Sequence, residues 1–571
     1  MKSAAQLIAE GRASAPITIP VTAFLRAKGA SSEAEYKRRC RDEGRLMYHM
    51  HVGLSTWEAT EDALHAVHDA LAAEGHSVDR FGLAFDRAMG VPEAERHLTM
   101  KETGPRIEAD QWDRVAQAVP IQPHTGDYMI GLPAGFQNTG RALAAGITTI
   151  GNVSQYSSYD VIGGFDDIAL TEATVQALAA LGAIRDRGGL AHSNLEDGTG
   201  AQAAHFGSYV GWAAIEMFAI ETLIGARLAH CYGNTIRNPE HRAVVHFALD
   251  DLRGRDSIGS MVYGNTVDQR PGKWARNLAV TTAQLMCDIA LQLRRPTGHA
   301  INPVPLTEAE RIPSPAEIVE VHLIARELER EVRKAPNVYD WERLEALGAG
   351  VAQYALLFRD RALQVFAVDG VDTADAAQVL LAMRRTTMPD LEARVDLAAP
   401  DEIATLEPWK ASQVRDVASR VGSPTGPRLD GLRVVLAVLE VHDLVRDALA
   451  TALPRFGAEI ILLNSATSID GVIRAALDED ADAVVLGTYN GNAVDLGERL
   501  VTARHQTGWN GDILMGGILN QDTGEALPID ARPRLAALGV RCVERVEDLV
   551  GLLANLNRAN LNGANLNRVV R

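Results

Sequence analysis

The chain has 571 residues, enough for roughly three or four domains, and 47% of them are hydrophobic. Its formal net charge of −18 argues against a broad electrostatic hold on nucleic acid or on anionic membranes, so we expect neither as a partner. The sequence shows no apolar run of about eighteen residues and no basic-then-apolar signal pattern, and the cytoplasm is the expected location. Its four cysteines are too widely spaced to indicate a zinc site or a disulfide framework.

Residues 1–45 are interpreted as an N-terminal arm. They contain a short amphipathic stretch, a segment rich in Pro and Thr at Pro16–Thr22, and a charged run at Glu33–Arg45. The charged run is typical of a solvated helix, and we expect no functional role for it.

From Leu46 to about Pro303, short apolar runs alternate with longer helical patterns, and the runs often end in Gly, Asn, Ser or His. This α/β alternation predicts a (β/α)₈ barrel, whose chemistry lies on loops at the carboxyl ends of its strands. We assign residues 46–395 to this barrel and a helical extension. The predicted strand ends are Met47–Gly53, Phe81–Arg87, Tyr128–Leu132, Thr148–Ser154, Gly189–Asn194, Arg227–Tyr232 and Ser260–Tyr263, with helices such as Glu58–Glu74, Thr171–Arg187 and Val210–Gly225 between them.

The extension is predicted to hold a charged helix at Ser314–Ala335 and further helices over Trp341–Met383, with a short strand at Gln364–Val368. Residues 396–430 contain four prolines with Ser and Gly and predict a linker.

Residues 431–556 predict a five-stranded, flavodoxin-like doubly wound domain. Three copies of A-N-L-N-x run from Ala554 to Arg568. Three copies cannot form a stable solenoid alone, so we assign residues 557–571 to a tail. The predicted strands of the doubly wound domain are Val434–Leu439, Glu459–Leu463, Ala483–Leu486, Asp512–Met515 and Val540–Val543.

One histidine follows the first strand of this C-terminal domain. Leu432–Leu439 is a nearly continuous apolar run, typical of a strand that is covered on both faces of a parallel sheet. Glu440–Asp443 breaks the run before a helical pattern begins, which predicts that His442 lies beyond the carboxyl end of the strand. Ligands bind at that edge of open α/β sheets.

Two later segments share this predicted edge. Gly487-Thr488-Tyr489 follows the third strand, and Gly516-Gly517 follows the fourth. The order E-x-H, a small or hydroxyl segment and G-G resembles the cobalamin-binding domain of mutases and methionine synthase, whose pattern is D-x-H-x-x-G, S-x-L and G-G.

The resemblance implies a role for each matching residue. His442 would be the lower axial ligand of the cobalt, and Glu440 would orient its imidazole. Thr488 would offer its hydroxyl to the nucleotide tail of the cofactor, and Gly516-Gly517 would let that tail pass close to the backbone. Asp443 and Tyr489 complete the expected cofactor-binding set, together with Gly487.

The sequence departs from the pattern at three places. Glu440 replaces the aspartate of the family, Val445 stands at its glycine, and Gly487-Thr488-Tyr489 replaces S-x-L. Asp443 also has a simpler interpretation, because an acidic residue in the first turn of a helix is favoured by the helix dipole.

The barrel half resembles the large catalytic subunit of glutamate (methylaspartate) mutase, and the C-terminal domain resembles its small subunit, so that the two would be fused in one chain. The segments that carry the barrel resemblance are Met50–Gly53, Phe85–Arg87, Gly151–Tyr159, His192–Gly200, Cys231–Asn234 and Arg270–Asn277. The resemblance implies an adenosylcobalamin-dependent isomerase with a radical mechanism, acting on a small molecule. It also implies a homodimer and a reactivating chaperone as partners.

Catalytic residues follow from the same resemblance. Arg87 matches an arginine near corrin and substrate, Lys273 matches a lysine on the adenosine ribose, and Tyr159 matches a tyrosine that contacts the substrate. We expect His51 and Arg87 to bind a carboxylate or carbonyl group, and Tyr156 and Tyr159 to line the radical pocket.

The substrate-binding groups of glutamate mutase are not retained. His51 stands at one carboxylate-binding arginine, the R-H-G-T-P-D segment is best matched by A-G-F-Q-N-T-G, and Val153 appears where a glutamate would hold the substrate ammonium. Since a charged hydrogen bond contributes about 1.5–3 kcal/mol, we expect a small carboxylic acid or amino acid other than glutamate.

Polar residues at the other predicted strand ends either cap helices and fill turns or contact cofactor and substrate. We expect no separate metal site among them. These residues are His51, His124, Asn152, Gln155, Tyr156, Tyr159, His192, Asn194, Glu196, Asp197, His230, Asn234 and Asn265.

Two alternatives to the mutase remain open. A corrinoid methyltransferase would use the same cobalamin domain with a barrel that binds a methyl donor. A non-catalytic cobalamin-binding protein would need an output module such as a DNA-binding helix pair, which this acidic sequence does not offer.

Overall fold

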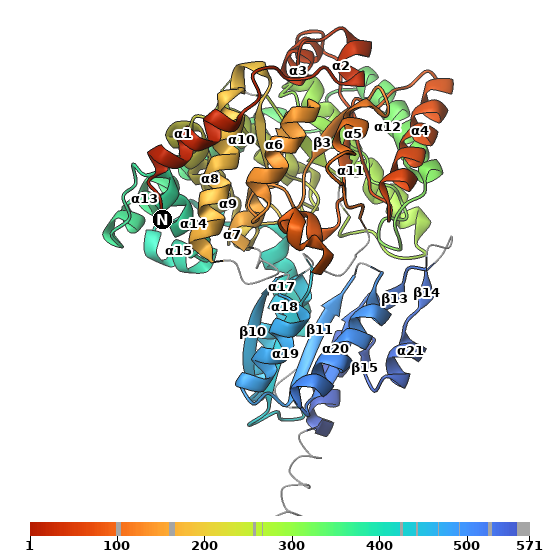
Figure 1. Ribbon diagram of the computed structural model, residues 1–571, viewed down its shortest axis with the longest axis vertical. Helices are drawn as coiled ribbons and strands as arrows, with labels where there is room; N and C mark the ends of the chain where they lie inside the picture. The colour runs from red at the N-terminus through yellow and green to blue at the C-terminus, as the bar shows by residue number, and fades with distance from the viewer. Residues whose placement is uncertain are drawn as a thin grey trace, which may run out of the picture. The chain divides into compact units, whose positions relative to one another are not determined.

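The computed structural model describes residues 1–98, 104–158, 166–254, 258–264, 266–422, 426–440, 443–465, 467–489, 491–523 and 528–556. The chain divides into two compact units, and the main boundary between them falls between Trp409 and Lys410. Both units are mixed α/β structures built on parallel strands (Figure 1). A search of the described helices finds none with the length and apolar character needed to cross a bilayer.

A six-stranded parallel sheet in sequential order forms the centre of the first unit. Its strands are short, and almost every residue in them is buried. They are β1 (His49–Val52), β2 (Arg80–Leu83), β3 (Gln122–Thr125), β4 (Thr149–Ile150), β5 (Leu190–Asn194) and β6 (Leu228–Cys231). Two further strands, β7 (Met261–Tyr263) and β8 (Ala300–Asn302), pair with each other in parallel.

Single parallel bridges connect the two sheets. Tyr232, just after β6, pairs with Val262 of β7, and Tyr48, just before β1, pairs with Ile301 of β8. Each strand from β1 to β7 therefore pairs or forms a bridge with the next, and β8 is bridged to the residue before β1.

Helices follow the strands and cover the sheet. Their starts are set by side-chain caps: Thr56 accepts a hydrogen bond from the N–H of Ala59 at the start of α4, and Ser314 and Glu317 form a capping box at the start of α12. Helix α12, which follows β8, packs on α4, which follows β1. The helices are α4 (Trp57–Ala73), α5 (Trp112–Gln117), α6 (Gly135–Ala145), α7 (Ser154–Ser158), α8 (Asp167–Ala183), α9 (Phe206–Met217), α10 (Pro239–Arg253), α11 (Trp274–Arg294) and α12 (Pro315–Lys334).

The strand predictions for the first unit are correct within a few residues at six of the seven positions. The exception is Tyr128–Leu132, which forms turns, while the strand lies earlier at Gln122–Thr125. The sequence Q-P-H-T lacks an apolar run although the strand is buried, and two of its polar side chains have partners inside the protein: Gln122 accepts a hydrogen bond from Thr22, and a ring nitrogen of His124 bonds the carbonyl of Thr149.

The N-terminal arm is not a solvated segment. It forms α1 (Ala4–Ser14), α2 (Ala23–Lys28) and α3 (Glu33–Asp42), and Figure 1 shows α1 alongside α8. The charged run of α3 is buried at Glu33 and Lys37, whose side chains are each 1% exposed. Glu33 lies 2.9 Å from Lys37 Nζ and 2.9 Å from Arg80 Nε, and it accepts a hydrogen bond from Thr149.

These contacts explain how charged residues can be buried at this point. Burial raises the pKa of the Glu33 carboxyl, but Lys37 and Arg80 outweigh that effect and lower it below the ordinary value. Arg80 is fully buried in β2 and donates a hydrogen bond to the carbonyl of Ser260. The ion cluster therefore joins α3 to β2 and to the segment before β7.

Four helices follow α12 in the first unit: α13 (Trp341–Val368), α14 (Ala376–Arg384), α15 (Met388–Val395) and α16 (Asp401–Ala404). The predicted strand at Gln364–Val368 is wrong, because these residues continue α13. The helical spacing of Phe358, Ala362 and Phe366, all buried, outweighs the local preference of aromatic and β-branched residues for strands.

The second unit contains a five-stranded parallel sheet in the order β10-β9-β11-β12-β15. Its central strands are buried on both faces, as their continuous apolar sequences predict. The strands are β9 (Arg433–Val438), β10 (Glu459–Ser465), β11 (Ala483–Thr488), β12 (Asp512–Gly517) and β15 (Arg541–Val543), and a small antiparallel pair is formed by β13 (Asn520–Gln521) and β14 (Ile529–Asp530). The helices are α17 (Trp409–Arg420), α18 (Leu444–Ala452), α19 (Ile469–Asp478), α20 (Ala493–Thr507) and α21 (Arg532–Ala537).

The segment predicted as a linker contributes to the core of this unit. Val417 and Ala418 of α17, and Val421 directly after it, pack in one apolar cluster with β9, β11 and α18. The prolines of this segment flank the helix rather than interrupting it. Composition alone therefore did not reveal a helix whose apolar face is covered by residues that follow it in the chain.

We expect Glu33→Ala to lower the free energy of unfolding by about 3–5 kcal/mol, because it leaves Lys37 and Arg80 as uncompensated buried cations. Urea titration of the full chain measures the change. The control is Glu43→Ala, since Glu43 is 51% exposed and pairs only with partly exposed Arg45. A loss at Glu33 no larger than the loss at Glu43 would show that the buried pair adds nothing.

Candidate functional site

Glycines occupy the carboxyl ends of β11 and β12 in the second unit. Gly487 pairs with Gly516, and Thr488 pairs with Gly517. Gly517 has φ +101°, and a Cβ there would lie 2.3 Å from the Thr488 carbonyl oxygen, so only glycine fits. A Cβ on Gly487 would meet only Tyr489, at 3.7 Å, which leaves open space beside β11.

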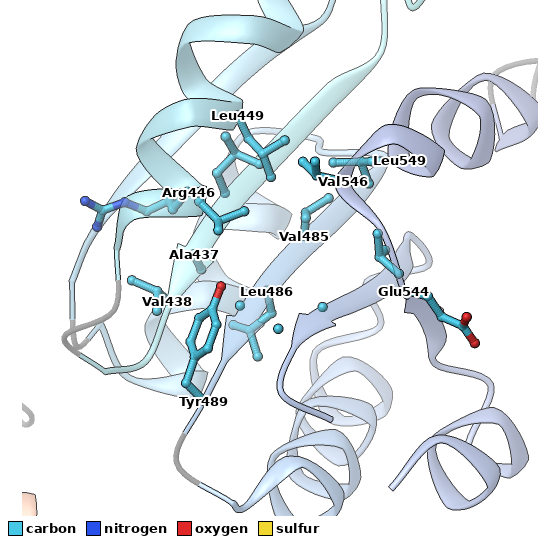
Figure 2. A pocket seen from close by; sticks show the side chains of 16 residues that line it. Ala437, Val438, Arg446, Leu449, Val485, Leu486, Tyr489, Glu544, Val546 and Leu549 are labelled. Carbon is cyan, nitrogen blue, oxygen red and sulfur yellow. The ribbon is translucent and has the colours of Figure 1, made fainter. Parts of the chain in front are cut away.

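That space is part of a cavity of about 180 Å³. The cavity lies on the face of the sheet that α18 covers, at the carboxyl ends of the strands. Figure 2 shows Leu449, Val546 and Leu549 on one side of it, while the Tyr489 ring lies beside Val438 and Leu486. Its lining is mostly apolar and comprises Leu436, Ala437, Val438, Val445, Arg446, Leu449, Val485, Leu486, Gly487, Tyr489, Gly516, Gly517, Val543, Glu544, Val546 and Leu549.

Glu440 binds the next strand. Its carboxylate is 5% exposed and accepts a hydrogen bond of 2.5 Å from the backbone N–H of Tyr489. Burial, with a smaller effect of Glu440, raises the pKa of the Tyr489 hydroxyl to about 12. His442, the predicted cobalt ligand, lies outside the described residues, so the predicted contact between Glu440 and its imidazole stays a prediction.

The Thr488 hydroxyl is fully buried and donates to Asn492 Oδ1 at 3.2 Å. Its predicted contact with a nucleotide tail would therefore use the lone pairs of its oxygen rather than its proton.

An ion network that the sequence analysis missed surrounds Asp443. Lys410 of α17 lies 2.7 Å from Asp443 and 3.2 Å from Asp447, and Arg446 contacts the same two carboxylates at 3.3 and 2.6 Å. Burial raises the pKa of Asp443, but Lys410 and Arg446 outweigh it and lower the pKa. The spacing D-x-x-R-D was a signal for Arg446, whereas Lys410 lies in the predicted linker.

Four imidazoles lie together inside the sheet of the first unit. The ring centroids of His49 and His51 are 4.8 Å apart, those of His49 and His124 are 5.7 Å apart, and those of His124 and His192 are 4.7 Å apart. Burial is the main cause that lowers the pKa values of all four, to about 4 for His51, so the rings are neutral near pH 7.

Two glycines leave room for these rings. A Cβ on Gly82 would lie 2.7 Å from His51 and 2.8 Å from His49, and one on Gly151 would lie 2.6 Å from His192. The imidazoles thus fill interior positions that branched apolar side chains usually occupy in parallel barrels.

A group of carboxyl and amide side chains follows β3, β4 and β5. Asn152 Nδ2 donates to Asp197 at 2.7 Å and lies 3.5 Å from Asp127, while Gln155 Nε2 donates to Asp127 at 3.0 Å. Asn194 Nδ2 donates to Asp197 at 2.9 Å. The sequence analysis missed Asp127 because it placed the neighbouring strand too late, so that Asp127 preceded the strand instead of following it.

Glu196 has a different environment in the same region. It accepts hydrogen bonds from the backbone N–H groups of Gly233 and Asn234 and from the hydroxyl of Thr235. It therefore joins the loop after β5 to the loop after β6, and we interpret it as a structural residue.

The predicted catalytic residues are not equally placed. His51 lies in β1, one residue before its end, and its ring is 5.1 Å from the Tyr263 ring, centroid to centroid, while Arg87 begins a short helical turn after β2. Lys273 is exposed, between β7 and α11. Tyr159 and Asn265 lie outside the described residues.

Tyr156 does not join the imidazoles. Its hydroxyl bonds the Thr171 hydroxyl of α8 at 2.7 Å, and Arg384 of α14 lies over its ring at 5.7 Å. Its contacts are those of a residue that holds α7 against α8 and α14.

Behind β5 and β6, Glu216 of α9 is buried among donors. It accepts hydrogen bonds from Ser193 at 2.8 Å and Trp212 at 3.1 Å, and His230 Nε2 lies 2.9 Å away. Arg253 donates to His230 Nδ1, which leaves Nε2 as the donor toward Glu216. Ser193 also bonds Ser154, so this network supports the loop that carries Asn152.

Comparisons with known proteins leave the family open. No protein-family model matches the chain, and the comparison with curated proteins gives no match. A solved structure described as a novel cobalamin-binding protein from Desulfitobacterium hafniense DCB-2 aligns at 17% identity with a TM-score of 0.19. The alignment covers 22% of this chain and 58% of that one, and a likeness at this level carries no conclusion about fold or function.

We expect the stability of the protein to depend on pH through Glu216. Burial raises the pKa of Glu216 from 4.5 to about 7, so between these values the folded state binds more protons than the unfolded state. Glu216 therefore makes its full contribution to the free energy of unfolding below pH 4.5. Roughly 3 kcal/mol of that free energy is lost as the pH rises through 7. Urea titrations at pH 5 and pH 7 measure the fall, which Glu216→Gln should reduce and the exposed control Glu58→Gln should not. Equal falls in all three proteins would contradict the assignment.

Proposed function

We propose that the second unit binds cobalamin and that the protein is an adenosylcobalamin-dependent radical isomerase acting on a small carboxylic acid or amino acid other than glutamate. The observation that carries the proposal is the apolar cavity at the carboxyl ends of β11 and β12, beside the segment that contains His442. Its position agrees with the sequence pattern that resembles cobalamin-binding domains.

The residues present fit such a cofactor. Open space beside Gly487 and the apolar lining suit the benzimidazole base of the nucleotide tail, since an apolar planar group loses little hydration there. Gly517 brings bare backbone to the rim of the cavity, where no side chain could stand. His442 would supply the cobalt ligand, and the strand order β10-β9-β11-β12-β15 corresponds to the flavodoxin-like order 2-1-3-4-5.

Each proposed residue has a distinct task. Gly487, Gly516 and Gly517 shape the cavity, and Tyr489 forms part of its wall. Glu440 holds the start of the β9–α18 loop to β11, and Asp443 holds its end to Lys410 and Arg446. When bound as adenosylcobalamin, the group supplies a carbon-centred radical by homolysis of its cobalt–carbon bond.

For the first unit we propose a complete (β/α)₈ barrel. The bridges from Tyr232 to Val262 and from Tyr48 to Ile301, and the packing of α12 on α4, support a closed ring of strands and helices. His51 and Arg87 at the carboxyl ends of β1 and β2 would bind and orient the substrate. The buried polar groups between the strands would exclude bulk water from the reacting atoms.

We expect His442→Ala to change the visible spectrum of the bound cofactor. The full chain mixed with adenosylcobalamin or hydroxocobalamin should give a spectrum of cobalt with the cofactor's own base displaced and a protein nitrogen bound, and the variant should lose that nitrogen signature. His505→Ala is the control, because His505 is exposed on α20. An unchanged spectrum and affinity in the His442 variant would mean that another group is the ligand.

Gly487→Val tests the cavity itself. Its Cβ meets only Tyr489 at 3.7 Å, so the protein should fold normally while the side chain fills the space. Overpacking against a ligand costs about 1–3 kcal/mol, so we expect cobalamin affinity to fall about tenfold or more. Gly551→Val, at an exposed position with no atom within 4 Å, should bind like the wild type.

The same preparations separate the reaction classes. An organic radical signal on adding candidate acids and amino acids would support the isomerase. Methyl transfer without such a signal would instead support the corrinoid methyltransferase.

A further inference from the structure

Asp127 and Asp197, which follow the carboxyl ends of β3 and β5, form a carboxyl pair with no balancing cation among the residues that the structure describes. The donors to these carboxyls are side-chain amides: Gln155 and Asn152 reach Asp127 Oδ1, and Asn152 and Asn194 reach Asp197 Oδ2. In the part of the chain that the structure describes, neither carboxyl forms an ion pair or accepts a side-chain hydrogen bond on its second oxygen.

The electrostatics of the pair are those of a site that lacks a cation. Burial raises the pKa of Asp127, and the pKa of Asp197 is raised well above its ordinary value by burial and then by Asp127 and Glu196. The groups that lower these pKa values are amides and not cations. At the opposite end of the strands, Glu33 is balanced by two buried cations, so uncompensated charge is not general in this unit.

A second observation indicates that a polar ligand completes this region. His124 is fully buried, and its Nε2 has no hydrogen-bond partner among the described residues. This nitrogen lies 3.3 Å from the place where a Cβ on Gly126 would be, directly before Asp127 in the chain. Both ring nitrogens of His49, also fully buried, lack partners as well. Because buried polar atoms are normally hydrogen bonded, these imidazoles call for a ligand or water with N–H or O–H groups.

The chemistry of these groups selects the ligand class. Two carboxyl oxygens and neutral imidazole nitrogens are hydrogen-bond acceptors for a donor with positive charge, whereas a carboxylate would be repelled. A metal ion is a poorer fit, since the described residues contain no group of three His, Cys, Asp or Glu side chains arranged to hold one. An organic ammonium group has the required charge and up to three N–H donors.

We propose that Asp127 and Asp197 bind the ammonium group of the substrate, so that the first unit acts on a small primary amine or amino acid. That the bound amine is a substrate rests on the proposed isomerase. The ammonium site itself is argued from the geometry of the first unit alone. Asn152 is the positioning residue of the site, because its amide contacts both carboxyls while its Oδ1 accepts the backbone N–H groups of Ser154 and Asn194.

The test uses the full chain without cobalamin and n-propylammonium as the probe, with binding measured by calorimetry or ligand-observed NMR at pH 8. Propionate and n-propanol, of similar size, should bind at least about tenfold more weakly, the change expected for one charge-assisted hydrogen bond. Tetramethylammonium, a cation without N–H groups, should also bind about tenfold more weakly. Propionate binding as well as n-propylammonium would overturn the proposal.

Variants locate the binding. Asp127→Asn and Asp197→Asn preserve shape and remove one charge each, and each should weaken n-propylammonium at least about tenfold. Asp62→Asn, at an exposed position of α4, makes the same charge change and should bind like the wild type. Unchanged affinity in both site variants would overturn the proposal, and the comparison of probes on the wild-type protein holds even if a variant fails to fold.

This test and the cobalamin tests can fail separately. Loss of the spectral change in His442→Ala concerns the second unit, while n-propylammonium binding is measured without the cofactor. A protein that binds n-propylammonium but no cobalamin would retain the ammonium site and reject the isomerase.

Discussion

Glycines in or next to the strands determine how much space lies beside each sheet of this protein, because they carry no Cβ. In the first unit, Gly82 and Gly151 leave room that the imidazoles of His49, His51 and His192 fill. In the second unit, Gly487 leaves room that no side chain fills, and the result is a cavity. The same absence of a Cβ therefore accompanies a packed polar interior in one sheet and an open cavity in the other.

Buried carboxyl groups have opposite surroundings at the two ends of the strands in the first unit. Glu33 lies between Lys37 and Arg80, and these contacts tie α3 to the sheet, which suits a structural role. Among the described residues, the side-chain donors to Asp127 and Asp197 are amides, and burial raises the pKa of both carboxyls. Titratable groups left in such a state are characteristic of functional sites, whereas compensated ones are characteristic of scaffolds.

The sequence predicted the elements whose burial leaves a continuous apolar run or a regular apolar pattern. The apolar run near Val434 gave β9 within one residue at each end, because a strand covered on both faces needs apolar side chains at every position. It failed where burial depends on distant partners. Lys37 looks solvated in the sequence because nothing local shows that its partner Glu33 also pairs with the buried Arg80 of β2, and Lys410 looks like part of a linker because its partners Asp443 and Asp447 follow thirty residues or so later.

The loop that carries His442 illustrates how much of a site depends on such distant contacts. Glu440, immediately before the two undescribed residues, is held by the N–H of Tyr489 at the end of β11. Asp443, immediately after them, is held by Lys410 of α17 and by Arg446, which in turn donates to the carbonyl of Leu463 in β10. Strands β10 and β11 and helix α17, all outside the β9–α18 segment, thus hold the residues on both sides of this loop. The two departures from the cobalamin-binding pattern both take part in this sheet edge: the Glu440 carboxylate reaches across to β11, and the Val445 side chain lines the cavity.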